Sequence, residues 1–161
     1  MQRPENRSAC PVNHAVEVFG DSWSFIILRD MMTVGSSTFG AFLDADERIG
    51  TSVLAQRLVE LELHGVITKA PDPLDGRRSR YALTASGRAA LPLVYELNRW
   101  GTRTNPNTDT AEAILEALDL PRDTVIDAWS RALAAGDSFF FGEMSVVLQL
   151  ALGDHTHRDT A

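Results

Sequence analysis

The sequence predicts a mainly α-helical fold with one small antiparallel β-hairpin, followed by a helical C-terminal extension. Apolar residues recur at three- and four-residue steps along most of the 161-residue chain, which is typical of amphipathic helices. Two short strand-like stretches flank a loop containing Pro, Asp and Gly at residues 71–79, and a linker rich in Thr, Asn and Pro follows at residues 102–110. We therefore expect one domain over residues 1–104 and the extension over residues 105–161.

The composition excludes several classes of protein. The chain is 44% hydrophobic and 23% charged, close to the average for a folded globular domain. Cys10 is the single cysteine, so no intrachain disulfide can form, and a reducing compartment fits best. Residues 1–9 are polar, unlike a signal peptide, and no apolar run reaches the roughly 20 residues that cross a bilayer. We expect a cytoplasmic protein that does not enter a membrane.

The formal net charge of -7 is unevenly distributed along the chain. Residues 105–161 contain three basic and ten acidic groups, whereas residues 44–104 contain nine basic and eight acidic groups. The basic groups of this middle region cluster at Lys69, Arg77, Arg78 and Arg80. A local basic patch therefore persists in an acidic protein, and the net charge does not exclude a nucleic acid as partner.

The first three predicted helices lie in the N-terminal third of the chain. The first covers residues 11–19, beginning at a proline that suits a first helical turn and ending before a glycine. Asp21 or Ser22 can cap the second, and residues 23–32 are apolar nearly all round. We expect this second helix to be buried, and a brief third helix to follow at residues 39–43.

The fourth predicted helix, from Thr51 to His64, is the most informative. Thr51 is a fair N-cap and Gly65 is the expected left-handed stop. Three leucines share a narrow stripe that should face the core, namely Leu54, Leu58 and Leu61. The opposite face carries Ser52, Gln56 and Val59. An outer face that is polar and weakly charged in its N-terminal half is typical of a helix that reads DNA.

A β-hairpin and a long helix complete the first domain. Val66 to Ala70 and Arg80 to Leu83 read as the two strands, with arginines at the base and tip of the hairpin. Thr84 or Ser86 can cap a helix that continues through Trp100. We expect this helix to contribute to a dimer.

The extension predicts further helices. One apolar stripe runs from Ala111 to Leu118, and a second begins after Pro121 and stops at Gly136. The apolar runs at residues 139–141 and 144–152 fit either a buried helix or a strand, and we favour helix.

Aromatic residues and histidines in the extension allow more than one interpretation. Residues 139–141, with Trp129 and Met144, fit core packing better than a ligand pocket or a dimer interface. Beyond Gly153 we expect disorder, and His155 and His157 are more simply solvated than metal ligands.

Taken in order, these residues resemble the HxlR-type regulators, which are winged-helix relatives of the MarR-type proteins. The similarity covers about residues 10–101 and depends on the order and spacing of its short pieces. These are Cys10-Pro11-Val12, Gly20-Asp21-Ser22-Trp23, Ile27-Leu28-Arg29-Asp30, Phe39, Leu54-Ala55-Gln56-Arg57-Leu58, Leu61-Glu62, Gly65-Val66-Ile67, Tyr81-Ala82-Leu83-Thr84, Gly87-Arg88, Leu91-Pro92-Leu93 and Trp100-Gly101.

The resemblance implies a winged helix-turn-helix fold and a sequence-specific transcription regulator, most simply a repressor. Such a regulator binds a pseudo-palindromic operator in duplex DNA as a homodimer, in which the N- and C-terminal helices pack against the partner. The alternative is an effector- or protein-binding module that keeps the fold with weak DNA affinity. A small-molecule effector is compatible with both interpretations.

Four residues of the fourth helix are candidates for DNA contact. Gln56 can pair with adenine in the major groove, and Ser52 can bind a base edge, although both would also suit an ordinary solvated face. Thr51 begins the same surface. Arg57 lies on its flank, where it can reach a phosphate or instead pair with Glu60 or Glu62.

The hairpin supplies the other candidates. Arg77, Arg78 and Arg80 would lie over the minor groove or along the backbone, with a solvated turn as the alternative. The family usually has basic residues where this chain has Ser22, Ser37 and Thr38, which predicts fewer phosphate contacts and a flatter salt dependence.

Cys10 is the remaining candidate site. The resemblance implies that a cysteine here can sense electrophiles or oxidants, and a helix N-terminus beside it would stabilise a thiolate. A small core residue is the alternative. The chain lacks a glycine-rich phosphate loop, an HExxH motif, a Gly-x-Ser-x-Gly motif and a Cys-x-x-Cys motif, so we expect no catalysis, no metal and no cofactor.

Overall fold

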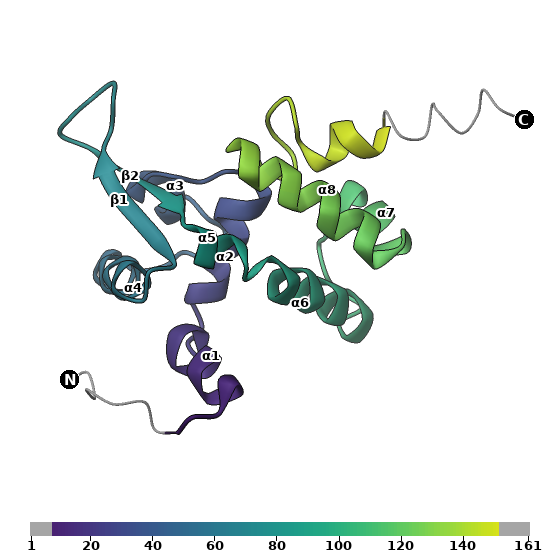
Figure 1. Ribbon diagram of the computed structural model, residues 1–161, viewed down its shortest axis with the longest axis horizontal. Coiled ribbons are helices and arrows are strands. Elements are labelled where there is room, and N and C mark those ends of the chain that lie inside the picture. The colour runs from purple at the N-terminus through teal and green to yellow at the C-terminus, as the bar shows by residue number, and fades with distance from the viewer. Residues whose placement is uncertain (1–7, 152–161) are drawn as a thin grey trace, which may run out of the picture. The chain divides into compact units, whose positions relative to one another are not determined.

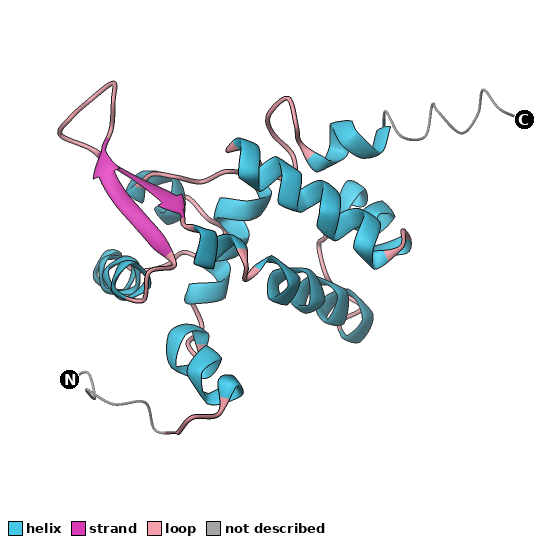
Figure 2. Ribbon diagram, in the orientation of Figure 1, coloured by secondary structure: helices cyan, strands magenta, loops and turns pink. Residues whose placement is uncertain are grey.

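The computed structural model describes residues 8–151. Helices dominate these residues, and the strands pair as a two-stranded antiparallel sheet (Figure 1, Figure 2). This architecture confirms the predicted fold class. The elements are α1 (Pro11–Phe19), α2 (Ser24–Thr33), α3 (Phe39–Leu43), α4 (Thr51–Leu63), β1 (Ile67–Pro71), β2 (Ser79–Leu83), α5 (Ala85–Arg88), α6 (Leu91–Thr104), α7 (Glu112–Asp119) and α8 (Arg122–Ala135), and residues 146–151 are also helical.

Contacts within the chain define two compact units. Among the described residues, the first unit takes residues 8–28 together with Ser37–Gly87, and the second takes Arg29–Ser36 together with residues 88–151. The boundary falls inside α2, so this helix supplies residues to both cores. The division into a first domain over residues 1–104 and a helical extension over residues 105–161 stays a prediction.

The core of the first unit forms where α4 packs against α3 and β1. The three leucines predicted to face inward are buried, with Leu54 at 0% exposure, Leu58 at 2% and Leu61 at 1%. Burial of each leucine contributes about 1.5–3 kcal/mol relative to an exposed side chain. The other large buried side chains of this unit are Ile27, Leu28, Phe42, Ile49, Val66, Ile67 and Tyr81.

The end of α4 shows why its length was predictable. Gly65 adopts a positive φ of 67°, and the Val66 amide donates to the Leu61 carbonyl at 2.9 Å. This is the left-handed stop that a glycine permits at low cost. The start differs from the prediction, because Gly50 occupies the N-cap position without a side-chain hydrogen bond and Thr51 is the first helical residue.

The hairpin is anchored at its base. β1 and β2 pair in register from Ile67 opposite Leu83 to Pro71 opposite Ser79. The segment before α3 extends this pairing, since the Tyr81 amide donates to the Ser37 carbonyl at 2.8 Å.

The helix predicted from Thr84 or Ser86 through Trp100 is wrong as a single helix. Thr84 caps only the short α5, accepting a hydrogen bond from the Gly87 amide at 3.0 Å, and α6 begins again at Leu91. Pro92 explains the break, because it has no N–H to donate and its ring would clash with the carbonyl four residues earlier. At its other end α6 continues to Thr104, so the linker begins at Asn105, three residues later than predicted.

The second unit is built around α8. The buried Trp129 donates its indole N–H to the Met32 carbonyl at 3.0 Å, which fixes α8 against the end of α2. Near the start of α8, Arg122 bonds the Glu96 carboxylate on α6 at 2.9 Å. As predicted, Pro121 precedes this helix and Gly136 ends it, with a φ of 85°.

Residues 139–141 are irregular, which contradicts the helix favoured from sequence, whereas residues 146–151 are helical as expected. The Phe139 and Phe140 amides donate to the Met32 and Thr33 carbonyls, at 2.9 and 3.1 Å, instead of to carbonyls of their own segment. Phe139 is buried against Trp129, with ring centroids 4.9 Å apart, as expected for a core residue.

Two further expectations concern the rest of the chain. The predicted disorder beyond Gly153 and the pair His155 and His157 lie outside the described residues. Within residues 8–151, no helix is long and apolar enough to cross a bilayer, and no cluster of three metal-ligating side chains occurs.

Candidate nucleic-acid interface

The exposed face of α4 carries the residues predicted to read DNA. Thr51, Ser52 and Gln56 are all exposed, on the side of the helix opposite its buried leucines. α3 precedes α4 and packs against it, and the turn between them contains Arg48 in a left-handed conformation with φ 55°. The two helices and this tight turn place the polar face of α4 toward solvent.

Glu60 interacts with two of the residues predicted to contact DNA, Gln56 and Arg57. The Gln56 side-chain amide donates to one oxygen of Glu60 at 2.9 Å, and the Arg57 guanidinium lies 2.6 Å from the other. Arg57 also lies 3.4 Å from the Asp21 carboxylate. The alternative in which Arg57 pairs within its own helix is therefore realised through Glu60, and Asp21 is a second partner that the sequence reading missed.

Asp21 connects this cluster to the start of α2. Its carboxylate accepts hydrogen bonds from the Trp23 amide at 2.7 Å and the Ser24 amide at 3.0 Å, and also from the Ser24 hydroxyl. Partial burial acts to raise the pKa of Asp21, but the Ser24 hydroxyl, the two amides and Arg57 together lower it below its ordinary value of 3.8. Of the two caps considered for this helix, the structure uses Asp21.

The hairpin arginines differ in how far they are neutralised. Arg80 lies 2.7 Å from the buried carboxylate of Asp72, and Arg78 lies 3.4 Å from Asp75. The Leu74 amide and then Arg80 lower the pKa of Asp72. The exposed Arg77 side chain makes no ion pair with any residue of the described chain.

Arg48 is a candidate that the sequence reading missed. It is exposed, stands immediately before α4, and makes no ion pair within residues 8–151. The available signal was its position as the single basic residue between the third and fourth predicted helices. The acidic residues Asp44, Asp46 and Glu47 that precede it drew attention only to the end of the third helix.

Cys10 stands directly before α1. Its thiol is exposed, Pro11 occupies the first turn, and the Cys10 amide donates to the Ser8 hydroxyl at 3.3 Å. The alternative of a buried core cysteine is therefore wrong. Its exposure makes the thiol accessible to an oxidant.

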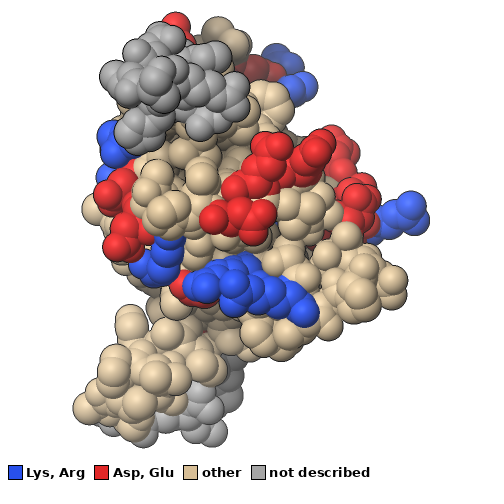
Figure 3. Space-filling view, turned by 90° about the vertical axis from the view of Figure 1, so that its right-hand side faces the viewer, with Lys and Arg blue, Asp and Glu red and all other residues tan. Residues whose placement is uncertain are grey.

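Helices α1 and α6 expose several apolar side chains, as α4 does through Val53, Val59 and Leu63. On α1, Val12 is 67% exposed and Val16 is 50% exposed. On α6, Leu93, Leu97 and Trp100 follow one another at helical spacing and are 44%, 46% and 68% exposed. Figure 3 shows a different kind of surface, on which acidic side chains gather and basic side chains form a separate row.

Known proteins with similar sequences are regulators. Residues 18–109 match the model of the HxlR-like helix-turn-helix family. The HTH-type transcriptional regulator sll1512 of Synechocystis is 34% identical over 98 residues, which cover 61% of this chain and 72% of the relative. YvaP, an HTH-type transcriptional regulator of Bacillus subtilis, is 33% identical over 94 residues, covering 58% of this chain and 86% of the relative.

Solved structures show the same fold. The crystal structure of PA1607 superposes with a TM-score of 0.60 and 33% identity, covering 66% of this chain and 74% of PA1607. The oxidised form of the redox regulator HypR superposes with a TM-score of 0.54 and 28% identity, covering 60% of this chain and 98% of HypR.

The family match ends before α7, so the extension built from α7, α8 and the segment after them lies beyond it. The match covers more than half of the chain and includes the helix-turn-helix and the hairpin that form the candidate interface. The chain therefore belongs to the HxlR-like helix-turn-helix family, a family of transcriptional regulators with a DNA-binding fold.

Proposed function

We propose that this protein is a homodimeric repressor that binds a pseudo-palindromic operator through α4 and the hairpin. The observation that carries the proposal is the two-sided character of α4. Leu54, Leu58 and Leu61 are buried in the first unit, while Thr51, Ser52 and Gln56 face solvent beside a turn and a hairpin that carry arginines. A helix of about this size fits the major groove of B-DNA.

In the proposed complex, Gln56 and Ser52 contact base edges, while Thr51 begins the helix close to the DNA backbone. Arg48 and Arg57 bind phosphates on either side of the groove, and the hairpin arginines Arg77, Arg78 and Arg80 follow the minor groove or the backbone. Phosphate contacts set the register of the helix, and base contacts supply the sequence preference.

The exposed apolar faces support the homodimer. A stripe formed by Leu93, Leu97 and Trp100 is costly to leave in water, and aromatic and aliphatic side chains of this kind dominate the buried centres of protein interfaces. Val12 and Val16 on α1 offer a second such surface. Two paired subunits would present two copies of α4 to half-sites about one DNA turn apart, and the bound dimer would block polymerase.

The second candidate function is a ligand- or protein-binding module with weak DNA affinity. The observation that favours it is that the candidate interface satisfies its own polar groups. Glu60 accepts a hydrogen bond from Gln56 and pairs with Arg57, and Asp72 pairs with Arg80. Under this alternative the fold persists, the residues 105–161 extension carries the main activity, and DNA binding is weak at physiological salt.

A titration of fluorescein-labelled duplex DNA separates the two candidates. We expect nanomolar binding to a fragment from the DNA adjoining the protein's own gene, at least about 1,000-fold tighter than to a scrambled duplex. Replacing Gln56 with Ala should lower the specific affinity by about 5- to 150-fold while leaving scrambled DNA unaffected. Equal, micromolar binding to both duplexes would favour the second candidate.

Cys10 as a redox or electrophile sensor is part of the proposal that rests on position alone. HypR, a redox regulator, shares this fold, and the Cys10 thiol is exposed at the start of α1. Because Cys10 is the only cysteine, oxidation would yield an intersubunit disulfide or a mixed disulfide. A non-reducing gel after treatment with a mild oxidant detects the intersubunit disulfide. If the oxidised protein binds the operator with unchanged affinity, Cys10 is not a sensor.

A further inference from the structure

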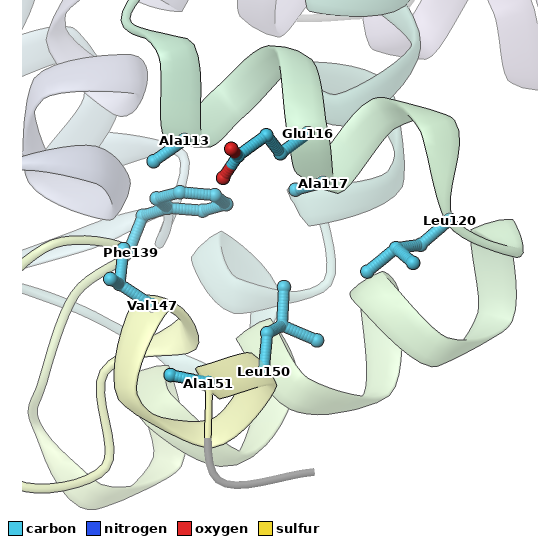
Figure 4. Close-up of a pocket in the computed structure, with 8 residues that line it drawn as sticks. All are labelled: Ala113, Glu116, Ala117, Leu120, Phe139, Val147, Leu150 and Ala151. Carbon is cyan, nitrogen blue, oxygen red and sulfur yellow. The ribbon is translucent and has the colours of Figure 1, made fainter. Parts of the chain in front are cut away.

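A pocket of about 330 Å³ lies within the second unit, outside the part of the chain that matches the family model. Three segments border this open pocket: α7 on one side, the irregular segment at Phe139, and the helix at residues 146–151 opposite α7 (Figure 4). Of its lining residues, Glu116, Leu120 and Ala151 are exposed. Its lining residues are Ala113, Glu116, Ala117, Leu120, Phe139, Val147, Leu150 and Ala151. The volume lies at the lower end of the range for pockets that hold small organic ligands, about 300–1,000 Å³.

The chemistry of the lining is asymmetric. Seven of the eight lining side chains are apolar, and Glu116 is the one charged group among them. In Figure 4 the Glu116 carboxylate points from α7 toward the space bordered by the Phe139 ring. Among residues 8–151, Glu116 has no ion-pair partner, although three arginines of the same unit, Arg99, Arg122 and Arg131, bond to other groups.

The walls are preformed by the fold. Phe139 is 1% exposed, its amide donates to the Met32 carbonyl at 2.9 Å, and its ring packs edge-on against the buried Trp129. Ala117 is 2% exposed on the inner side of α7. Three of the lining residues, Ala113, Ala117 and Ala151, are alanines, whose side chains take up little of the space.

We propose that this pocket binds a small hydrophobic organic cation, such as an amine attached to an aromatic or branched aliphatic body. The apolar body would occupy the space between α7 and the 146–151 helix, and the ammonium group would lie against the Glu116 carboxylate. Apolar contact supplies most of the affinity, while Glu116 selects the sign of the ligand's charge, because an exposed ion pair alone is weak.

Isothermal titration of the full chain with three matched probes tests the proposal at pH 7. The probes are 4-phenylbutylamine, the neutral 4-phenylbutanol and the anionic 4-phenylbutyrate. We expect the amine to bind most tightly, the alcohol more weakly and the carboxylate least. Replacing Glu116 with Gln should weaken the amine about two- to fivefold and leave the alcohol unchanged.

Two further variants complete the test. Glu112→Gln makes the same charge change on α7 outside the pocket and should leave all three affinities unchanged. Ala113→Leu places a larger side chain in the lining and should abolish binding of all three probes, with circular dichroism and Tm confirming that the variant is folded.

Three outcomes would overturn the inference. These are an absence of binding by the wild-type protein to any probe at millimolar concentration, equal affinity for the amine and the carboxylate, and full binding by a folded Ala113→Leu variant. None of these measurements involves DNA, so a negative result for the pocket would leave the proposed repressor function untouched.

Discussion

The helices α4 and α6 are of similar length, yet the N-terminal half of α4 and the exposed stripe of α6 present different chemistry to solvent. α4 buries three leucines and exposes Thr51, Ser52 and Gln56 in its N-terminal half, with Val59 and Leu63 exposed nearer its end, whereas α6 exposes a stripe of Leu93, Leu97 and Trp100. The polar face suits a hydrated, charged surface such as DNA, and the apolar face suits another protein surface. The difference indicates that a helix in this protein is specialised by what it leaves outside the core as much as by what it buries.

The largest expected effect comes from the buried side of α4. Replacing Leu58 with Ala should lower the free energy of unfolding by about 2–5 kcal/mol, because the side chain is 2% exposed and its loss leaves a cavity. Urea denaturation followed by circular dichroism measures this. The matched control is Val59→Ala, one residue along and 53% exposed, which should change stability by less than about 0.5 kcal/mol. Equal losses of unfolding free energy for the two variants would contradict the assignment of a buried and an exposed side to α4.

The exposed side of α6 provides the next effect. Trp100→Ala should raise the dimer dissociation constant by about 30-fold or more, as expected for an aromatic residue central to an interface, while leaving monomer stability nearly unchanged. Sedimentation velocity across a concentration series measures the constant. Arg103→Gln, an exposed change on the same helix, is the control. If Trp100→Ala destabilises the fold and leaves association intact, the stripe serves the subunit's own core.

A smaller effect is expected at the junction of α2 and α4. Asp21→Ala removes the N-cap of α2 and should cost about 0.5–2 kcal/mol at pH 7. The folded pKa of Asp21 lies below its ordinary value of 3.8, so its contribution is fully present above that pH and is lost as the pH falls through the folded pKa. Denaturation at pH 7, 4 and 2.5 should show the gap between wild type and variant closing in acid. A gap that widened in acid would contradict the assignment.

The smallest effect concerns the charged partners on α4 itself. Glu60→Gln should raise affinity for duplex DNA by about two- to fivefold, because Gln56 and Arg57 lose a charged acceptor and the DNA loses a repelling carboxylate. Glu62→Gln makes the same charge change on this helix without a bond to either residue. Fluorescence anisotropy at two salt concentrations compares them, and identical gains would mean that only net charge matters.

Elements with local signals were predictable from the sequence. The buried stripe, the length of α4 and the hairpin follow from periodicity and from Gly65, whose left-handed φ needs no information from elsewhere in the chain. The break before α6 also had a local signal in Pro92, but the apolar periodicity on both sides of the proline masked it.

Features that depend on distant partners were not predictable. The 139–141 segment stays irregular because its amides bond to the end of α2, which no local pattern reveals. Arg57 pairs with Glu60, which helical spacing suggested, and also with Asp21, which only the packing of α4 beside the start of α2 brings near. The pocket at Phe139 likewise forms from segments that are separate in the sequence, and core packing was the favoured interpretation there.

The bond between Arg80 and Asp72 has a consequence for how a regulator of this kind would behave on a chromosome. An arginine that is already neutralised within its own hairpin displaces few counterions when it approaches DNA. The affinity of the protein for nonspecific DNA sites is therefore low. Because such sites outnumber any operator by many orders of magnitude, weaker retention by them leaves more molecules free to find it. A small number of copies per cell would then be enough to keep the operator occupied.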